Sequence, residues 1–238
     1  MRAGARLGCG KRLTGMLNPV KLWREYRLGD FRTRTRITAL FSMLGNFALA
    51  AGKAVIGIFT VSLFMLVSAF YSALTGLAKQ FYYRGALICK EDIKKETVYY
   101  CFMAIFLLAA SLVYSLYMVR LFFISSGLVY GKIAGITVAA VSFTELFMAV
   151  RGLVKSNKLN DMLVSGLKIV NLSAALTALV LTQSALLSFT SGIEIAYSYV
   201  TAAFGLCVGL VSSLLSVLML LKARRIGRDG GDSAGKHR

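Results

Sequence analysis

Few residues within the long apolar segments of this sequence have side chains suited to acid–base or ligand chemistry. Two of them, Lys53 and Glu145, are ionisable, and three, Asn46, Asn171 and Gln183, carry amides. An ionisable side chain at the centre of a membrane span costs about 2.5–3.5 kcal/mol on insertion scales, so each one needs a physical reason. We take these five residues as the candidate polar lining of a site within the apolar segments.

Each of these side chains has a structural and a functional interpretation. Glu145 has the deepest carboxylate, which suits either a proton-coupled carrier or a structural hydrogen bond. Lys53 could extend its ammonium to the nearer interface or pair with Glu145. For the amides, hydrogen bonds between helices, worth about 0.6 kcal/mol on average, compete with a polar cavity lining.

The sequence gives little support for other chemistry. Its one histidine is His237, and its four cysteines, Cys9, Cys89, Cys101 and Cys207, form no CxxC pair and no zinc spacing. We find no nucleophile elbow, HExxH motif, Walker loop or dinucleotide-binding glycine pattern. We therefore expect neither an enzyme nor a bound metal or cofactor.

Composition predicts that transmembrane helices position the polar residues. The chain is 57% hydrophobic and 16% charged, whereas a soluble domain carries about 25% charged residues. The charges are clumped, and long stretches between them contain none. A net charge of +18 would suggest nucleic acid in a soluble protein, but in a membrane protein Lys and Arg lie against anionic headgroups. We expect the bilayer and anionic lipid headgroups as partners, and no nucleic acid.

The apolar segments predict an all-α, polytopic membrane protein with a six-helix transmembrane bundle. Residues 37–78 contain a single charge, Lys53. One helix of that length would measure about 63 Å, twice the roughly 30 Å hydrocarbon core, so the chain must turn back between Gly57 and Ser62. The predicted spans are residues 37–57, 62–81, 97–119, 133–150, 169–189 and 195–221.

Basic residues predict the orientation of these spans. Of the 28 Lys and Arg, 25 lie in the N-terminal arm, two loops and the tail on one side, which the positive-inside rule makes cytoplasmic. We predict a multi-pass protein of the cell membrane with both termini in the cytoplasm. The arm at residues 1–36 could contain an interfacial helix, and the basic tail at residues 222–238 is predicted to be disordered.

Small residues predict close packing between helices. Gly131 and Gly135 form a GxxxG motif at the fourth span, and Ala174, Ala175 and Ala178 form a small face on the fifth. Such faces are compatible with a homodimer without identifying one.

Residues 46–79 resemble the first two spans of the cation diffusion facilitator family. The family pattern of Asn, Lys seven residues on, Gly four further and Ser five further is met by Asn46, Lys53, Gly57 and Ser62, and an apolar run follows. The resemblance implies a six-span, transporter-like bundle with cytoplasmic termini.

The resemblance also implies a metal site, and this sequence departs from it. The family places carboxylate and imidazole ligands four residues apart on two spans, because residues i and i+4 share one helix face. The corresponding residues here are Tyr71 and Thr75, preceded by Ser68, and Lys168 and Leu172. None is a thiolate, imidazole or carboxylate, so we expect the metal-transport site of the family to be lost. The family's cytoplasmic metal-sensing domain also has no counterpart.

Two functions therefore remain open. The first is a carrier-like protein of unknown substrate that uses the candidate polar lining. Glu145 would suit a cation or proton there, whereas Lys53 and Lys168 would favour an anion. The second is a non-transporting structural or partner-binding membrane protein, whose basic ends engage anionic lipid or an acidic partner.

Overall fold

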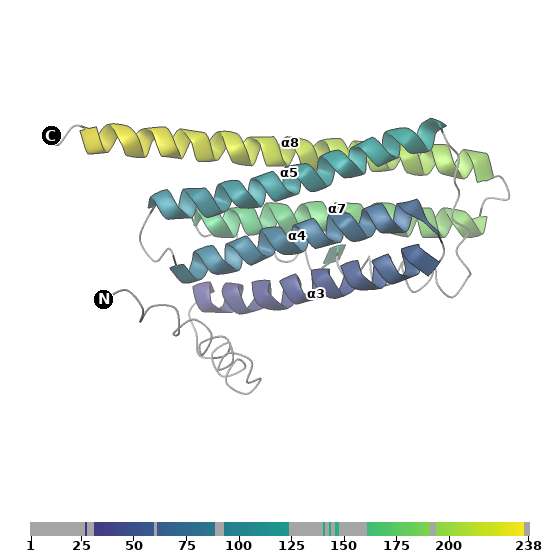
Figure 1. The fold of residues 1–238 in the computed structure, drawn as a ribbon, viewed down its shortest axis with the longest axis horizontal. Coiled ribbons are helices and arrows are strands. Elements are labelled where there is room, and N and C mark those ends of the chain that lie inside the picture. The colour runs from purple at the N-terminus through teal and green to yellow at the C-terminus, as the bar shows by residue number, and fades with distance from the viewer. Residues whose placement is uncertain are drawn as a thin grey trace.

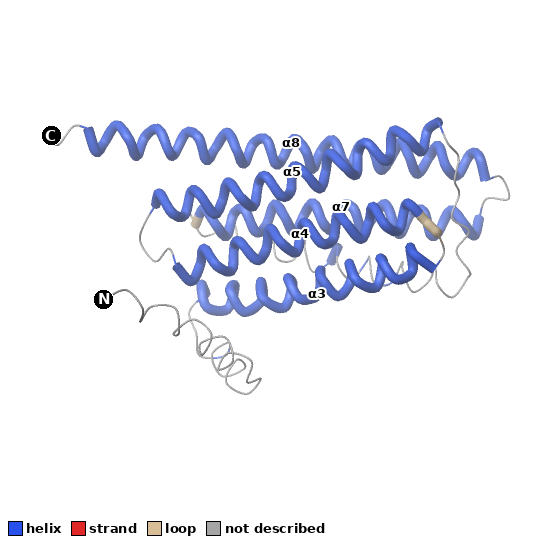
Figure 2. The backbone as a smooth tube through the Cα atoms, in the orientation of Figure 1, coloured by secondary structure: helices blue, strands red, loops and turns tan. Residues whose placement is uncertain are grey.

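The protein is an all-α bundle throughout the part of the chain that its computed structural model describes. That part comprises residues 27, 31–59, 61–88, 93–123, 140, 143, 146–147, 161–190 and 194–235. Its helices are α3 (Phe31–Phe59), α4 (Leu63–Ile88), α5 (Ile93–Phe123), α7 (Met162–Thr190) and α8 (Glu194–Gly235). Figure 2 shows them as the blue segments of the tube. Five of the six predicted spans fall within these helices. Glu145, most of the predicted span at 133–150 and nearly all of the N-terminal arm before α3 lie outside the described residues.

The five helices lie side by side with their axes roughly aligned (Figure 1). α4 packs against α3, α5 and α7, and α8 packs chiefly against α5 and also against α7. α3 makes its extensive contact with α4, at the outside of the described bundle. The turn predicted between Gly57 and Ser62 lies where α3 ends and α4 begins.

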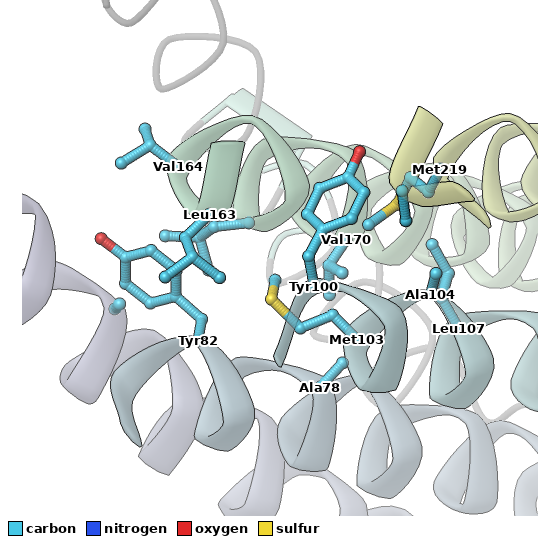
Figure 3. Close-up of a cluster of buried hydrophobic side chains, with 13 residues drawn as sticks. Ala78, Tyr82, Tyr100, Met103, Ala104, Leu107, Leu163, Val164, Val170 and Met219 are labelled. Atoms are coloured by element: carbon cyan, nitrogen blue, oxygen red, sulfur yellow. The ribbon is translucent and has the colours of Figure 1, made fainter. Parts of the chain in front are cut away.

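Two apolar clusters hold the bundle together. The Tyr100 cluster joins all five helices and includes Tyr82, Tyr100, Leu163 and Met219; Figure 3 shows their side chains converging from different helices. The Tyr114 cluster includes residues such as Phe64, Tyr114, Leu181 and Ala202. From the first cluster to the second, residue numbers rise along α5 and α7 and fall along α4 and α8. Thus α5 and α7 run in the same direction.

Four of the five helices are long and apolar enough to cross a membrane. The candidate segments are Thr33–Phe59, Lys94–Phe123, Met162–Ser184 and Ser198–Ile226. Large apolar side chains such as Phe41, Leu116 and Leu214 are exposed on the outer faces of these helices. A contiguous apolar surface of this kind is unfavourable in water and favourable against lipid, so the helices fit a membrane location.

α4 is the exception, because its interior positions are polar. Ser68, Ser72, Thr75 and Lys79 are all buried in it. The last three of these side chains form hydrogen bonds with residues of α3. A polar helix is tolerable in a membrane protein when its neighbours cover it, and α3, α5 and α7 pack against α4.

α8 is longer than any bilayer requires. It continues through Gly235, whereas the sequence analysis predicted a disordered tail from residue 222. Its 42 residues span about 63 Å at the usual helical rise. In Figure 1 it projects beyond the other helices toward the C-terminus. Its exposed Lys222, Arg224 and Arg225 begin just after Met219, at the level of the Tyr100 cluster.

Candidate functional site

A ladder of polar contacts joins α3 to α4. Ser42 accepts a hydrogen bond from the Lys79 ammonium at 2.7 Å, Asn46 donates its amide to the Thr75 hydroxyl at 3.0 Å, and the Lys53 ammonium donates to the Ser72 hydroxyl at 3.1 Å. The α3 residues form one stripe and the α4 residues another, as two antiparallel helices require. Both predicted residues of α3, Asn46 and Lys53, therefore act in the contact between the helices.

Lys79 is a buried charge that the predicted polar lining does not include. Its side chain is 3% exposed, and it lies within α4, one turn before Tyr82 of the Tyr100 cluster. The long apolar stem of a lysine can pack while its ammonium reaches a polar partner. Ser42 supplies such a partner.

The turn between α3 and α4 is built from the other two positions of the sequence resemblance. The Ser62 amide donates to the Gly57 carbonyl at 2.8 Å, and the Val61 amide donates to the Ile58 carbonyl at 3.3 Å. This pair of bonds is the Schellman ending of a helix. The Ser62 hydroxyl then accepts from the Met65 amide at 3.3 Å and caps α4. Asn46, Lys53, Gly57 and Ser62 thus all contribute to the α3–α4 hairpin.

Buried hydroxyls occupy the middle of the bundle, beside the Tyr114 cluster, of which Tyr71 is a member. Three helices carry a hydroxyl pair four residues apart: Ser68 and Ser72 on α4, Ser173 and Thr177 on α7, and Ser212 and Ser216 on α8, all of them buried. In each pair the second hydroxyl donates to the backbone carbonyl of the first residue, at 3.0, 3.1 and 2.8 Å respectively. Among the described residues, the first hydroxyl of each pair has no hydrogen-bond partner.

Tyr71 brings these helices to one point. Its hydroxyl is directed at the hydroxyls of Ser173, Thr177 and Ser212, yet it completes a hydrogen bond with none of them. Its ring packs edge-on against Tyr114 of α5, with centroids 5.6 Å apart. We call Tyr71, Ser173, Thr177 and Ser212 the hydroxyl cluster. A buried hydroxyl without a partner costs about 1–3 kcal/mol.

The hydroxyl cluster also identifies the face of α7 that meets α4. The sequence resemblance paired Tyr71 and Thr75 with Lys168 and Leu172, whereas Ser173 and Thr177 are the residues that Tyr71 faces. The signal for this face was present in the sequence as the recurring four-residue spacing of Ser and Thr. The predicted polar lining was chosen from amides and charges and did not include these hydroxyls.

Glycines let the helices around the cluster approach closely. A Cβ at Gly205 of α8 would lie 2.5 Å from the Met118 sulfur, and one at Gly209 would overlap the Ser115 hydroxyl. On α7, a Cβ at Gly166 would lie 2.9 Å from the Tyr100 ring. These contacts draw α5 against α7 and α8. Apolar packing therefore encloses the hydroxyl cluster on both sides along the bundle axis.

Of the five predicted polar residues, the structure describes four, two on α3 and two on α7. Asn46 and Lys53 lie at the α3–α4 contact, and Asn171 and Gln183 are half-buried on α7. Within the described part of the chain, neither Asn171 nor Gln183 makes a side-chain hydrogen bond. The two are twelve residues apart on α7, about 18 Å along the helix. Glu145 lies outside the described residues.

Neither the described side chains nor a comparison with known proteins identifies a ligand. Among the residues that the structure describes, no group of three or more His, Cys, Asp or Glu is placed to hold a metal ion. No known protein family, curated protein or solved structure shows significant similarity to this chain.

Proposed function

We propose that the protein is a six-span membrane carrier whose hydroxyl cluster binds a small polar solute near the middle of the bilayer. The observation that carries the proposal is the meeting of buried hydroxyls from three helices at Tyr71. Among the described residues, the hydroxyls of Tyr71, Ser173 and Ser212 have no hydrogen-bond partner. Carriers commonly bind substrate near the bilayer midplane. Here the apolar clusters on either side would separate that site from both aqueous phases.

The directions of the helices support six spans. α5 and α7 run in the same direction, as the two apolar clusters require. If both cross the membrane, the chain must cross it an odd number of times between them. Residues 133–150, which the sequence predicts as a span, fall within this interval. The proposal counts one crossing there, and α3, α4, α5, α7 and α8 supply the other five.

The distribution of charge supports cytoplasmic termini. We call the end of the bundle beyond the Tyr100 cluster the basic end. Its exposed side chains on α4, α5 and α8 are Arg84, Lys94, Lys95, Lys222, Arg224 and Arg225. We call the opposite end, where α3 meets α4, the turn end. The positive-inside rule assigns the basic end to the cytoplasm, where anionic headgroups would attract it.

The chemistry of the hydroxyl cluster favours a neutral or anionic solute. Hydroxyls both donate and accept hydrogen bonds, so they suit small molecules with mixed polar groups. Ser72 and Thr75, beside Tyr71 on α4, are already bonded to the Lys53 ammonium and the Asn46 amide. The Lys53 ammonium, which bonds the residue next to Tyr71, opposes the entry of a cation.

Osmotic reswelling of proteoliposomes tests the proposal. The purified protein is reconstituted in phosphatidylcholine vesicles, which are shrunk with glycerol, urea or potassium phosphate and followed by light scattering. We expect faster reswelling than in protein-free vesicles with at least one probe. Ser173→Ala with Ser212→Ala should slow it about tenfold, the effect of losing about 1.4 kcal/mol of interaction. Thr182→Ala should not, because that hydroxyl bonds the Ala178 carbonyl away from the cluster.

A structural or partner-binding role is the second candidate. It is favoured by the α3–α4 ladder, in which Asn46, Lys53, Ser72 and Thr75 already bond one another. Polar residues used in this way join helices and need no solute. Reswelling no faster than that of protein-free vesicles, with all three probes, would favour this role over transport.

The relationship to cation diffusion facilitators is part of the first proposal. Its support is the spacing of Asn46, Lys53, Gly57 and Ser62 and their joint use in the α3–α4 hairpin. We propose a shared scaffold with a hydroxyl cluster in place of a metal site.

A further inference from the structure

The tip of the α3–α4 hairpin carries exposed apolar side chains. The exposed fractions of its side chains are 67% for Ile58, 84% for Phe59, 89% for Val61 and 44% for Leu63. No charged residue occurs between Lys53 and Lys79. In water, turns are usually built from Gly, Asn, Asp and Ser, so this composition calls for a different surrounding.

The backbone of the turn is suited to an apolar medium. Hydrogen bonds within the turn engage the Val61 and Ser62 amides. The Ser62 hydroxyl accepts from the Met65 amide and the Ser62 carbonyl from the Leu66 amide. Satisfying backbone groups internally is the condition for placing a chain in hydrocarbon, where water cannot replace a missing bond. The Schellman motif and the Ser62 cap together meet this condition at these four amides.

Val61 shows that an apolar side chain is retained at the tip despite backbone strain. Its φ is 50°, in the left-handed region that helix endings normally assign to Gly or Asn. A β-branched residue there is an outlier. Since Val61 makes no core contact, packing within the protein does not account for the choice, whereas contact with lipid does.

The turn also ends short of the neighbouring helices. The hydroxyl cluster marks a common level on α4, α7 and α8, from which the distance to the end of each helix can be counted. On α4, Tyr71 lies eight residues from the start of the helix. Thr177 lies thirteen from the end of α7, and Ser212 lies eighteen from the start of α8. At the usual rise these distances are about 12, 20 and 27 Å. Figure 1 shows α7 and α8 reaching beyond the α3–α4 turn at this end.

From these observations we propose that the α3–α4 turn is embedded in the acyl-chain region of the bilayer. Ile58, Phe59, Val61 and Leu63 contact lipid hydrocarbon, while α7 and α8 pass beyond them toward the headgroups. The inference rests on the membrane location of the proposed function and is independent of transport.

Spin labels at single cysteines test this placement. The four natural cysteines are replaced by Ser or Ala, and a nitroxide is attached at Val61→Cys in phosphatidylcholine–phosphatidylglycerol vesicles. Collision with oxygen, which concentrates in hydrocarbon, is compared with collision with a water-soluble nickel chelate. Phe59→Cys is a second tip position that leaves the Val61 backbone unchanged. Three references are Leu116→Cys at mid-bundle, Tyr199→Cys on the projecting part of α8, and Arg225→Cys at the basic end.

We expect both tip labels to collide more with oxygen than with nickel, and to lie shallower than Leu116 and deeper than Tyr199. Nickel access at the tip equal to that at Arg225 would overturn the proposal in favour of an aqueous turn. Low collision with both reagents would overturn it in favour of a protein contact. Nickel access at Leu116 would overturn the membrane location itself, which separates that failure from a failure at the turn.

Discussion

The Asn46 amide donates a hydrogen bond to the Thr75 hydroxyl across the α3–α4 contact at 3.0 Å. This bond allows the contribution of one interhelical amide to the free energy of unfolding to be measured. We predict that Asn46→Leu and Thr75→Val each lower the free energy of unfolding, and that a double-mutant cycle gives a coupling of about 0.6 kcal/mol. Unfolding in mixed micelles provides the measurement. Asn171→Leu is the control, because Asn171 makes no side-chain bond to another described residue. Additive effects at positions 46 and 75 would contradict the assigned contact.

The cost of a polar side chain in a membrane singles out charges and amides in a sequence but not hydroxyls. Lys53 and Asn46 stood out because each needs a partner in hydrocarbon, and both have one. Serine and threonine do not stand out, since each can bond its own helix. Their role emerged only when Tyr71 was seen to face Ser173 and Ser212. A hydroxyl that bonds its own helix is indistinguishable in sequence from one that awaits a ligand.

Among the elements, the contact between α5 and α8 depends on two glycines. We predict that Gly209→Ala lowers the free energy of unfolding by about 1–3 kcal/mol, the usual cost of overpacking, because the new methyl would overlap the Ser115 hydroxyl. Gly52→Ala in α3 is the matched control, since a Cβ there meets nothing within 4 Å. Its stability should stay equal or rise slightly, as helix propensity favours Ala. Thermal unfolding in detergent checks both variants, and equal losses would contradict the packing.

The turn between α3 and α4 provides a second test at this scale. We predict that Val61→Gly is tolerated or modestly stabilising. The left-handed conformation costs an L-residue roughly 1–2 kcal/mol, and Gly loses only part of that gain through backbone entropy. The apparent melting temperature in detergent, compared with that of Val61→Ala, measures the difference. A lower melting temperature for Gly than for Ala would show that φ at this position is not strained.

The ends of the helices were easier to predict than their faces. Five predicted spans overlap the described helices, since a bilayer admits only a narrow range of lengths. The inward faces of α5, α7 and α8 were not predictable, because these helices are apolar all round and lipid is as apolar as a protein core. The helical continuation of α8 to Gly235 was missed because its Gly-rich, charged composition is typical of disorder.

At the scale of the whole molecule, the basic end and the turn end should lie on opposite sides of the membrane. We predict that Lys94→Cys and Arg225→Cys react with an impermeant maleimide only when the cytoplasmic side is accessible. Tyr199→Cys, on the part of α8 that projects beyond the α3–α4 turn, should react from the outside. Labelling of inverted vesicles and of intact cells makes the comparison. Reaction of Lys94→Cys and Arg225→Cys from opposite sides would contradict six spans.

The central claim is that the hydroxyl cluster serves a solute and not the stability of the bundle. Tyr71→Phe tests it most directly, because the change removes one hydroxyl and leaves the ring against Tyr114. Melting temperature and osmotic reswelling are measured on the same preparation. The account predicts unchanged or higher stability, since a buried hydroxyl without a partner is lost, together with reswelling slowed about tenfold. Lower stability with unchanged reswelling would contradict it and make the cluster a structural feature of the bundle.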